Sequence, residues 1–103
     1  MGRKGGFLGE GLSGLTVGSK TLDPTFDSGV KSYTVDTDDA TNTVTATAEN
    51  PNDTVEIKLN GVSQASGTGT VSKSLTWTAN TDTVTVEVTH GSSKEIYTIT
   101  VTH

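Results

Sequence analysis

The sequence contains no cysteine and only two prolines, five aromatic residues and seven basic residues. Without cysteine the chain has no disulfide framework, no thiolate nucleophile and no thiolate metal site. Twelve acidic residues give a formal charge of −5 at pH 7, and such a field repels nucleic acid and anionic membranes. No apolar run reaches the length of a signal peptide core or a membrane span. We therefore expect no nucleic-acid partner and no membrane insertion.

Hydrophobic residues are also scarce, so their pattern must specify the fold. Only 22 of the 103 residues are Leu, Ile, Val or Phe, which is close to the level typical of disordered chains. The sequence has 21 threonines and 11 valines, and these β-branched residues favour strands over helices. No segment shows a helical period, and the length is too short for a barrel enzyme or a dinucleotide-binding fold. The composition predicts one all-β domain.

The first eleven residues differ in composition from the rest of the chain. They contain five glycines, so ordering them costs much backbone entropy, with only Phe7 and Leu8 to offset it. The basic pair Arg3 and Lys4 is too small to form a nucleic-acid patch. We predict that residues 1–11 form a flexible arm. Its apolar and basic side chains are the candidate partner-binding residues, because apolar groups on an arm can anchor it in a groove of a partner: Arg3, Lys4, Phe7 and Leu8.

From Leu12 to His103 the sequence reads as one domain of about seven short strands. Apolar and polar residues alternate with a period of two, and turn signals recur about every ten residues. This pattern predicts an antiparallel sandwich over residues 12–103. The predicted buried positions are those on the apolar side of the alternation: Val35, Val44, Ala46, Val55, Ile57, Trp77, Val86, Ile99 and Val101.

Three local features refine this prediction. Asn60-Gly61 follows an alternating strand and predicts a type I′ hairpin turn. Pro24 confines its segment to a sheet edge or to a crossing between sheets. Residues 65–69 are small, and we interpret them as a loose connection. The last two strands should form a hairpin around residues 90–93.

Several segments resemble a known family. They are Leu12-Ser-Gly-Leu15-Thr-Val17, Leu22-Asp-Pro24-Thr-Phe26, Tyr33-Thr-Val35 and Tyr97-Thr-Ile99-Thr-Val101. In their order and spacing these motifs are similar to the cadherin-like β-sandwich repeat of bacterial and phage surface proteins, over residues 12–103. The resemblance implies an immunoglobulin-like fold and a spacer, display or adhesive role. It implies no general catalytic residues.

Catalytic and metal-binding chemistry finds little support in the residues. His90 lies in a predicted turn and His103 is the last residue, so we expect neither to be held by an acid as a catalytic triad requires. Asp36, Asp38 and Asp39 could present oxygens to calcium, but the segment has too few ligands for such a site. We interpret them, like the cluster Asn50, Asn52 and Asp53, as solvated turns. The sequence predicts no enzyme, no metal site and no cofactor.

Trp77 bears on a carbohydrate-binding role. An exposed tryptophan could stack on a sugar ring, but its parity with Val71 and Leu75 favours the core.

The leading hypothesis is a non-enzymatic module on a phage virion surface, a head or tail decoration protein held on a capsid or tail subunit by its arm. One alternative is an adhesive or spacer repeat of a bacterial cell-surface or extracellular protein, with neighbouring repeats as partners. Another is a carbohydrate-binding module for cell-surface glycans.

Overall fold

A computed structural model of the chain describes residues 11–103, which form eight β-strands and no helix. The strands are β1 (Leu12–Val17), β2 (Ser32–Asp36), β3 (Thr41–Ala48), β4 (Thr54–Leu59), β5 (Val62–Thr68), β6 (Thr70–Thr76), β7 (Thr81–His90) and β8 (Ser93–Thr102). The described residues therefore contain no helix able to cross a membrane. The predicted all-β fold class is confirmed.

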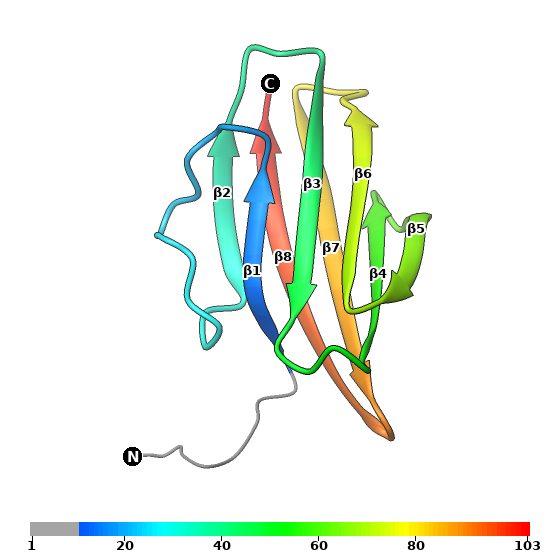
Figure 1. Ribbon diagram of the computed structural model, residues 1–103. Coiled ribbons are helices and arrows are strands. Elements are labelled where there is room, and N and C mark those ends of the chain that lie inside the picture. Colours follow the sequence, from blue (N-terminus) through cyan, green and yellow to red (C-terminus); the bar gives the residue numbers. More distant parts are fainter. Residues whose placement is uncertain (1–10) are drawn as a thin grey trace.

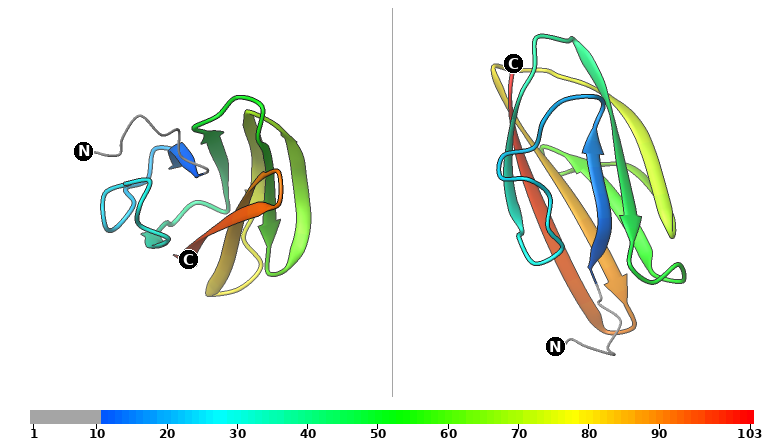
Figure 2. Two further views of the ribbon diagram at one scale, coloured as in Figure 1. Left: turned by 90° about the horizontal axis from the view of Figure 1, so that it is seen from below. Right: turned by 60° about the vertical axis from the view of Figure 1, so that its left-hand side comes forward.

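The strands form two facing sheets, with the order β1-β3-β6 in one and β2-β8-β7-β4-β5 in the other. Figure 1 shows the three-stranded sheet in front of the five-stranded sheet, and Figure 2 gives two further views of the layers. Successive side chains of a strand point to opposite faces, so each sheet turns one face toward a shared core and the other toward solvent. The architecture is the sandwich that the alternation predicts.

One strand pair departs from the antiparallel arrangement, because β2 lies parallel to β8. The connection of residues 18–31 returns along the molecule before β2 begins, so that β1 and β2 run in the same direction (Figure 1). Pro24 lies in this connection, which crosses from one sheet to the other as expected. Next to it, Asp23 pairs through its backbone with Thr34 on the edge of β2. The two parallel strands, β2 and β8, are separated along the chain by five other strands, so no tight turn joins them.

The structure has one strand more than the seven that the sequence indicates, and the additional strand is β5. It contains residues 65–68, which the small side chains of residues 65–69 led us to interpret as a loose connection. It pairs only with β4 and lies at the edge of its sheet, so its small side chains need not fill the core. A register shift next to Ile57 interrupts the pairing. The hairpin turn before β5 has the positive φ angles of a type I′ turn, 51° at Asn60 and 86° at Gly61, as predicted.

The core lies between the two sheets and contains every position that the alternation predicts to be buried. Their exposed fractions run from 0% to 6%: Val35, Val44, Ala46, Val55, Ile57, Trp77, Val86, Ile99 and Val101. Two tyrosines, Tyr33 and Tyr97, are among the largest fully buried side chains. The predicted hairpin of the last two strands, β7 and β8, is also present.

The sandwich is elongated, with dimensions of 41 × 24 × 19 Å. Its strands run along the long direction, and β1 begins at one end of the molecule while β8 finishes at the other (Figure 1). The two ends of the described chain, Gly11 and His103, therefore lie at opposite ends of the sandwich. Groups attached at these two ends would therefore be held apart by the length of the sandwich.

Candidate functional site

The four predicted partner-binding residues, Arg3, Lys4, Phe7 and Leu8, lie outside the described residues. Of the predicted arm the structure describes only Gly11, which is buried. Its carbonyl accepts a hydrogen bond from the backbone N–H of Glu49 at 2.9 Å. A Cβ atom on Gly11 would lie 2.1 Å from the hydroxyl oxygen of Tyr97, so only glycine fits there. The chain is thus fixed to the sandwich from residue 11 onward.

The Tyr97 hydroxyl holds this end of the molecule together. It accepts a hydrogen bond from the backbone N–H of Leu12 at 2.9 Å and donates one to the carbonyl of Ser28 at 2.7 Å. Burial raises the pKa of Tyr97 above its ordinary value, so the hydroxyl stays protonated and able to donate. One side chain of β8 therefore joins the start of β1 to the connection before β2.

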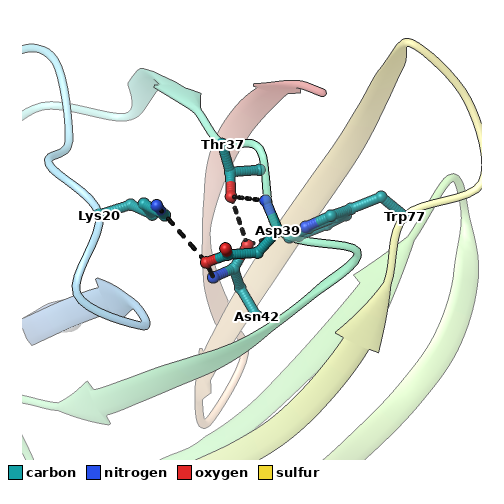
Figure 3. Close-up of polar contacts among 5 residues, drawn as sticks. All are labelled: Lys20, Thr37, Asp39, Asn42 and Trp77. Atoms are coloured by element: carbon teal, nitrogen blue, oxygen red, sulfur yellow. Dashed lines mark hydrogen bonds and ion pairs between the residues drawn. The ribbon is translucent and has the colours of Figure 1, made fainter.

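A second polar cluster closes the opposite end of the sandwich (Figure 3). The Oδ1 atom of Asn42 accepts hydrogen bonds from Trp77 Nε1 and from Thr37 Oγ1, each at 2.9 Å. Its Nδ2 donates to Asp39 Oδ2 at 3.1 Å, and the ammonium of Lys20 lies 3.4 Å from the same oxygen. The hydrogen bond from Asn42 and the charge of Lys20 hold the pKa of Asp39 below its ordinary value.

This cluster settles the role of Trp77. Its side chain is only 6% exposed and its indole N–H is used inside the protein, so the ring offers no stacking surface for a sugar. The prediction of a core tryptophan is confirmed. Asp39, one of the three acids considered for calcium, is likewise engaged in the cluster with Lys20.

Beside this cluster lies an open cleft of about 600 Å³. Short polar and acidic side chains dominate its lining, which is made up of Ser19, Lys20, Thr21, Leu22, Asp23, Thr25, Thr34 and Asp36. No aromatic residue lines the cleft, and its one cation is already paired with Asp39. Within residues 11–103 no group of three His, Asp or Glu side chains is placed to hold a metal ion. The cleft is the candidate binding site, although its lining supplies neither a stacking platform nor a metal centre.

One sequence-based interpretation is wrong. We expected His90 to have no acidic partner and Asp53 to lie in a solvated turn, but Asp53 is only 2% exposed and its Oδ1 lies 2.5 Å from His90 Nδ1. The pairing of β4 with β7 causes this contact. Thr54 lies opposite Thr89, so Asp53, which precedes Thr54, lies next to His90, which follows Thr89. Only a prediction of that strand pairing could have found it. His103, by contrast, is exposed at the end of β8.

The Asp53–His90 contact joins elements that lie far apart in the sequence. Asp53 belongs to the loop between β3 and β4, and its carbonyl also accepts a hydrogen bond from the backbone N–H of Gly69 at 2.9 Å. His90 ends β7, and its ring is about half exposed. The contact therefore fixes the loop to the end of the β7–β8 hairpin, which is a structural role.

Comparison with known proteins identifies one family. The family model described as a cadherin-like beta sandwich domain matches residues 12–103. Domains of this kind are generally structural or adhesive modules rather than catalysts. Neither the curated proteins nor the solved structures contain a match.

Proposed function

Because the chain belongs to the cadherin-like β-sandwich family, we propose that it is a non-enzymatic display module, specifically a decoration protein on the surface of a phage virion. In this proposal residues 1–11 bind a capsid or tail subunit and the sandwich is the displayed part. Phe7 and Leu8 fill pockets of the partner, and Arg3 and Lys4 meet its acidic groups.

The observation that carries the proposal is the placement of the two ends of the sandwich. Residue 11 precedes β1 at one end of a domain 41 Å long (Figure 1). The polar cleft is lined by residues that follow β1 and by residues of β2, and Asp39 lies in the turn between β2 and β3, toward the other end. A chain held through its first residues would extend away from the particle and present that polar end. Repeated copies on a symmetric particle would make a modest affinity at each site sufficient for high occupancy.

The same placement favours one alternative, a spacer or adhesive repeat of a bacterial cell-surface or extracellular protein. A domain with its two ends far apart spans distance when neighbouring repeats continue the chain. A carbohydrate-binding module has less support, since Trp77 is buried and no aromatic residue lines the cleft. An enzymatic role also has little support, because Asp39, Asp53 and Asp82 are all engaged in structural contacts.

Deleting residues 2–10 tests the proposal. Gly11 is retained because it bonds to Glu49, so the shortened chain should keep the thermal unfolding midpoint of the full chain. We expect the full chain to co-sediment with phage particles that lack this protein and the shortened chain to remain in solution. The variant with Phe7→Ala and Leu8→Ala keeps the length of the arm and should lose binding as well. Equal sedimentation of the full and shortened chains would place the contact on the sandwich and contradict the proposal.

A further inference from the structure

The turn between β4 and β5 contains a pair of residues that can react with each other. Asn60 is the one asparagine in the sequence that precedes a glycine, and both Asn60 and Gly61 are exposed to solvent. A glycine has no Cβ atom, so no side chain hinders its backbone nitrogen from approaching the side-chain amide of the preceding residue. The turn is therefore a place where the chain can change covalently.

The reaction is deamidation, and it needs only water. In the first step the backbone nitrogen of Gly61 gives up its proton to hydroxide and forms a bond to Cγ of Asn60. The bond between Cγ and Nδ2 breaks, and the amide nitrogen takes a proton from water and leaves as ammonia. In the second step water adds to one carbonyl of the resulting succinimide ring, and one ring C–N bond breaks. The net change adds one water, releases one ammonia and leaves aspartate or isoaspartate at position 60.

The neighbouring strand β7 holds the Asn60 side chain in place. Asn60 Nδ2 donates to Asp82 Oδ1 at 2.7 Å, and Asn60 Oδ1 accepts a hydrogen bond from the backbone N–H of Thr83 at 2.9 Å. The backbone N–H of Asn60 also donates to the carbonyl of Thr83 at 2.8 Å. Asp82 is only 1% exposed and accepts three further hydrogen bonds from the turn before β7. Rotating the amide toward the Gly61 nitrogen would therefore break both side-chain bonds.

A carboxylate at position 60 would reverse these contacts. It has no proton to donate to Asp82 Oδ1, so two negatively charged groups would face each other where a hydrogen bond now lies. Isoaspartate also inserts one extra methylene into the backbone of a type I′ turn. The geometry of this turn fixes the register in which β4 pairs with β5. Both products therefore act against the pairing of these two strands.

We propose that Asn60 is a covalent modification site, that Asp82 and Thr83 protect it in the folded chain, and that its deamidation releases the edge strand β5. The released strand is β5 because it pairs only with β4 and places no fully buried side chain in the core. β4 itself remains paired with β7 on its other side. This modification goes beyond display and does not rest on the proposed attachment to a virion, since every residue involved lies within residues 11–103.

The rate of deamidation tests the protection. The full-length chain is incubated in mildly alkaline buffer, either folded or unfolded in urea, and conversion of Asn60 is followed by peptide mass spectrometry. The bond from Asn60 to Asp82 has a charged acceptor, so we expect the folded chain to react about ten-fold more slowly than the unfolded chain, or slower still. Equal rates in the folded and unfolded chain would overturn the protection.

Two variants separate the role of Asp82 from a general loss of stability. Asp82→Ala removes the acceptor of the Asn60 amide, whereas Val44→Ala removes buried methyl groups in the other sheet and leaves the turn intact. We expect folded Asp82→Ala to deamidate about ten-fold faster than the folded original chain, and Val44→Ala to stay within about two-fold of it. An unchanged rate in Asp82→Ala, or equal acceleration in both variants, would overturn the assignment to Asp82.

A pair of asparagine variants tests the release of β5. Asn60→Asp reproduces the aspartate product, and the matched control Asn52→Asp adds the same charge at another exposed asparagine, in the loop before β4. We expect Asn60→Asp to accelerate amide hydrogen exchange in β5 about ten-fold or more at neutral pH and to leave β8 unchanged. Asn52→Asp should leave both strands unchanged. Unchanged exchange of β5 in Asn60→Asp, or equal acceleration in both variants, would contradict the release.

Discussion

Replacing Ile57 with alanine is expected to lower the free energy of unfolding by about 2–5 kcal/mol, because the change removes buried methyl groups and leaves a cavity. Ile57 is 0% exposed in β4, which lies between β7 and β5 in the five-stranded sheet. Both neighbouring strands fix the backbone around it, so the space cannot close by a local shift. Denaturant unfolding of the variant and the original chain measures the difference.

Ile96→Ala is the matched control for this substitution. Ile96 lies on β8 with 46% of its surface exposed and points away from the core, so it loses the same atoms without opening a cavity. Its free energy of unfolding should change by less than about 0.5 kcal/mol. Similar losses of unfolding free energy in the two variants would contradict the assignment of Ile57 to the buried face and of Ile96 to the exposed face of the sheet.

Asp82→Asn is expected to lower the free energy of unfolding by about 1–3 kcal/mol, the range for a buried polar group that loses its partners. Asp82 is 1% exposed and accepts hydrogen bonds from Asn60 Nδ2 at 2.7 Å and from Thr78 Oγ1 at 2.9 Å. Its other oxygen accepts from the backbone N–H groups of Thr78 and Ala79 at 3.0 and 3.3 Å. An asparagine has one acceptor oxygen, so its amide N–H₂ would face donors at one of the two positions.

The same carboxylate predicts a dependence of stability on pH. Burial by itself raises the pKa of Asp82, but the hydrogen bonds from Asn60, Thr78 and Ala79 outweigh it, and the pKa lies below its ordinary value. A lowered pKa in the folded state contributes stability that is present above the unfolded pKa, about 3.9, and is lost as the pH falls through the folded value. The stability difference between the original chain and Asp82→Asn should therefore shrink below about pH 4.

Asp38→Asn provides the control for this pH dependence. Asp38 is an exposed carboxyl in the turn between β2 and β3, and its replacement should change neither the stability at neutral pH nor the slope in acid. Glu87 also has a lowered pKa, because Lys58 and Lys94 donate to its carboxylate, so the original chain keeps a second source of acid sensitivity. If Asp82→Asn and Asp38→Asn gave the same unfolding curves from pH 7 to pH 3, the buried network around Asp82 would not exist as described.

The alternation of residues predicted the core because parity alone decides which face of a strand is buried. Val44, Ala46 and Ile57 needed no information beyond their own strands. By contrast β5 carries mostly small and polar side chains at a sheet edge, and a strand that buries little leaves little pattern in its sequence. The parallel pairing of β2 with β8 also left no local signal, since it depends on the path of residues 18–31 between the sheets.

The polar contacts were harder to predict than the core. Asp53 and His90 are 37 positions apart, and Asn60 and Asp82 are 22 apart. Each pair meets because β4 lies beside β7, and alternation within a strand does not state which strands are neighbours. Asp53 and Asp82 therefore read as ordinary turn residues in the sequence, whereas in the fold both are buried and hold distant segments together.

Residues 1–11 are proposed to bind the partner while the sandwich is displayed, and transfer of these residues to another protein tests this proposal. Residues 1–11 are fused to the N-terminus of a carrier protein that does not bind the particles, and its co-sedimentation with phage particles that lack this protein is measured. We expect the carrier to become particle-bound, and we expect Phe7→Ala with Leu8→Ala in the fused segment to abolish this binding. A fused carrier that stays in solution, while a chain of residues 11–103 still sediments with the particles, would contradict the claim.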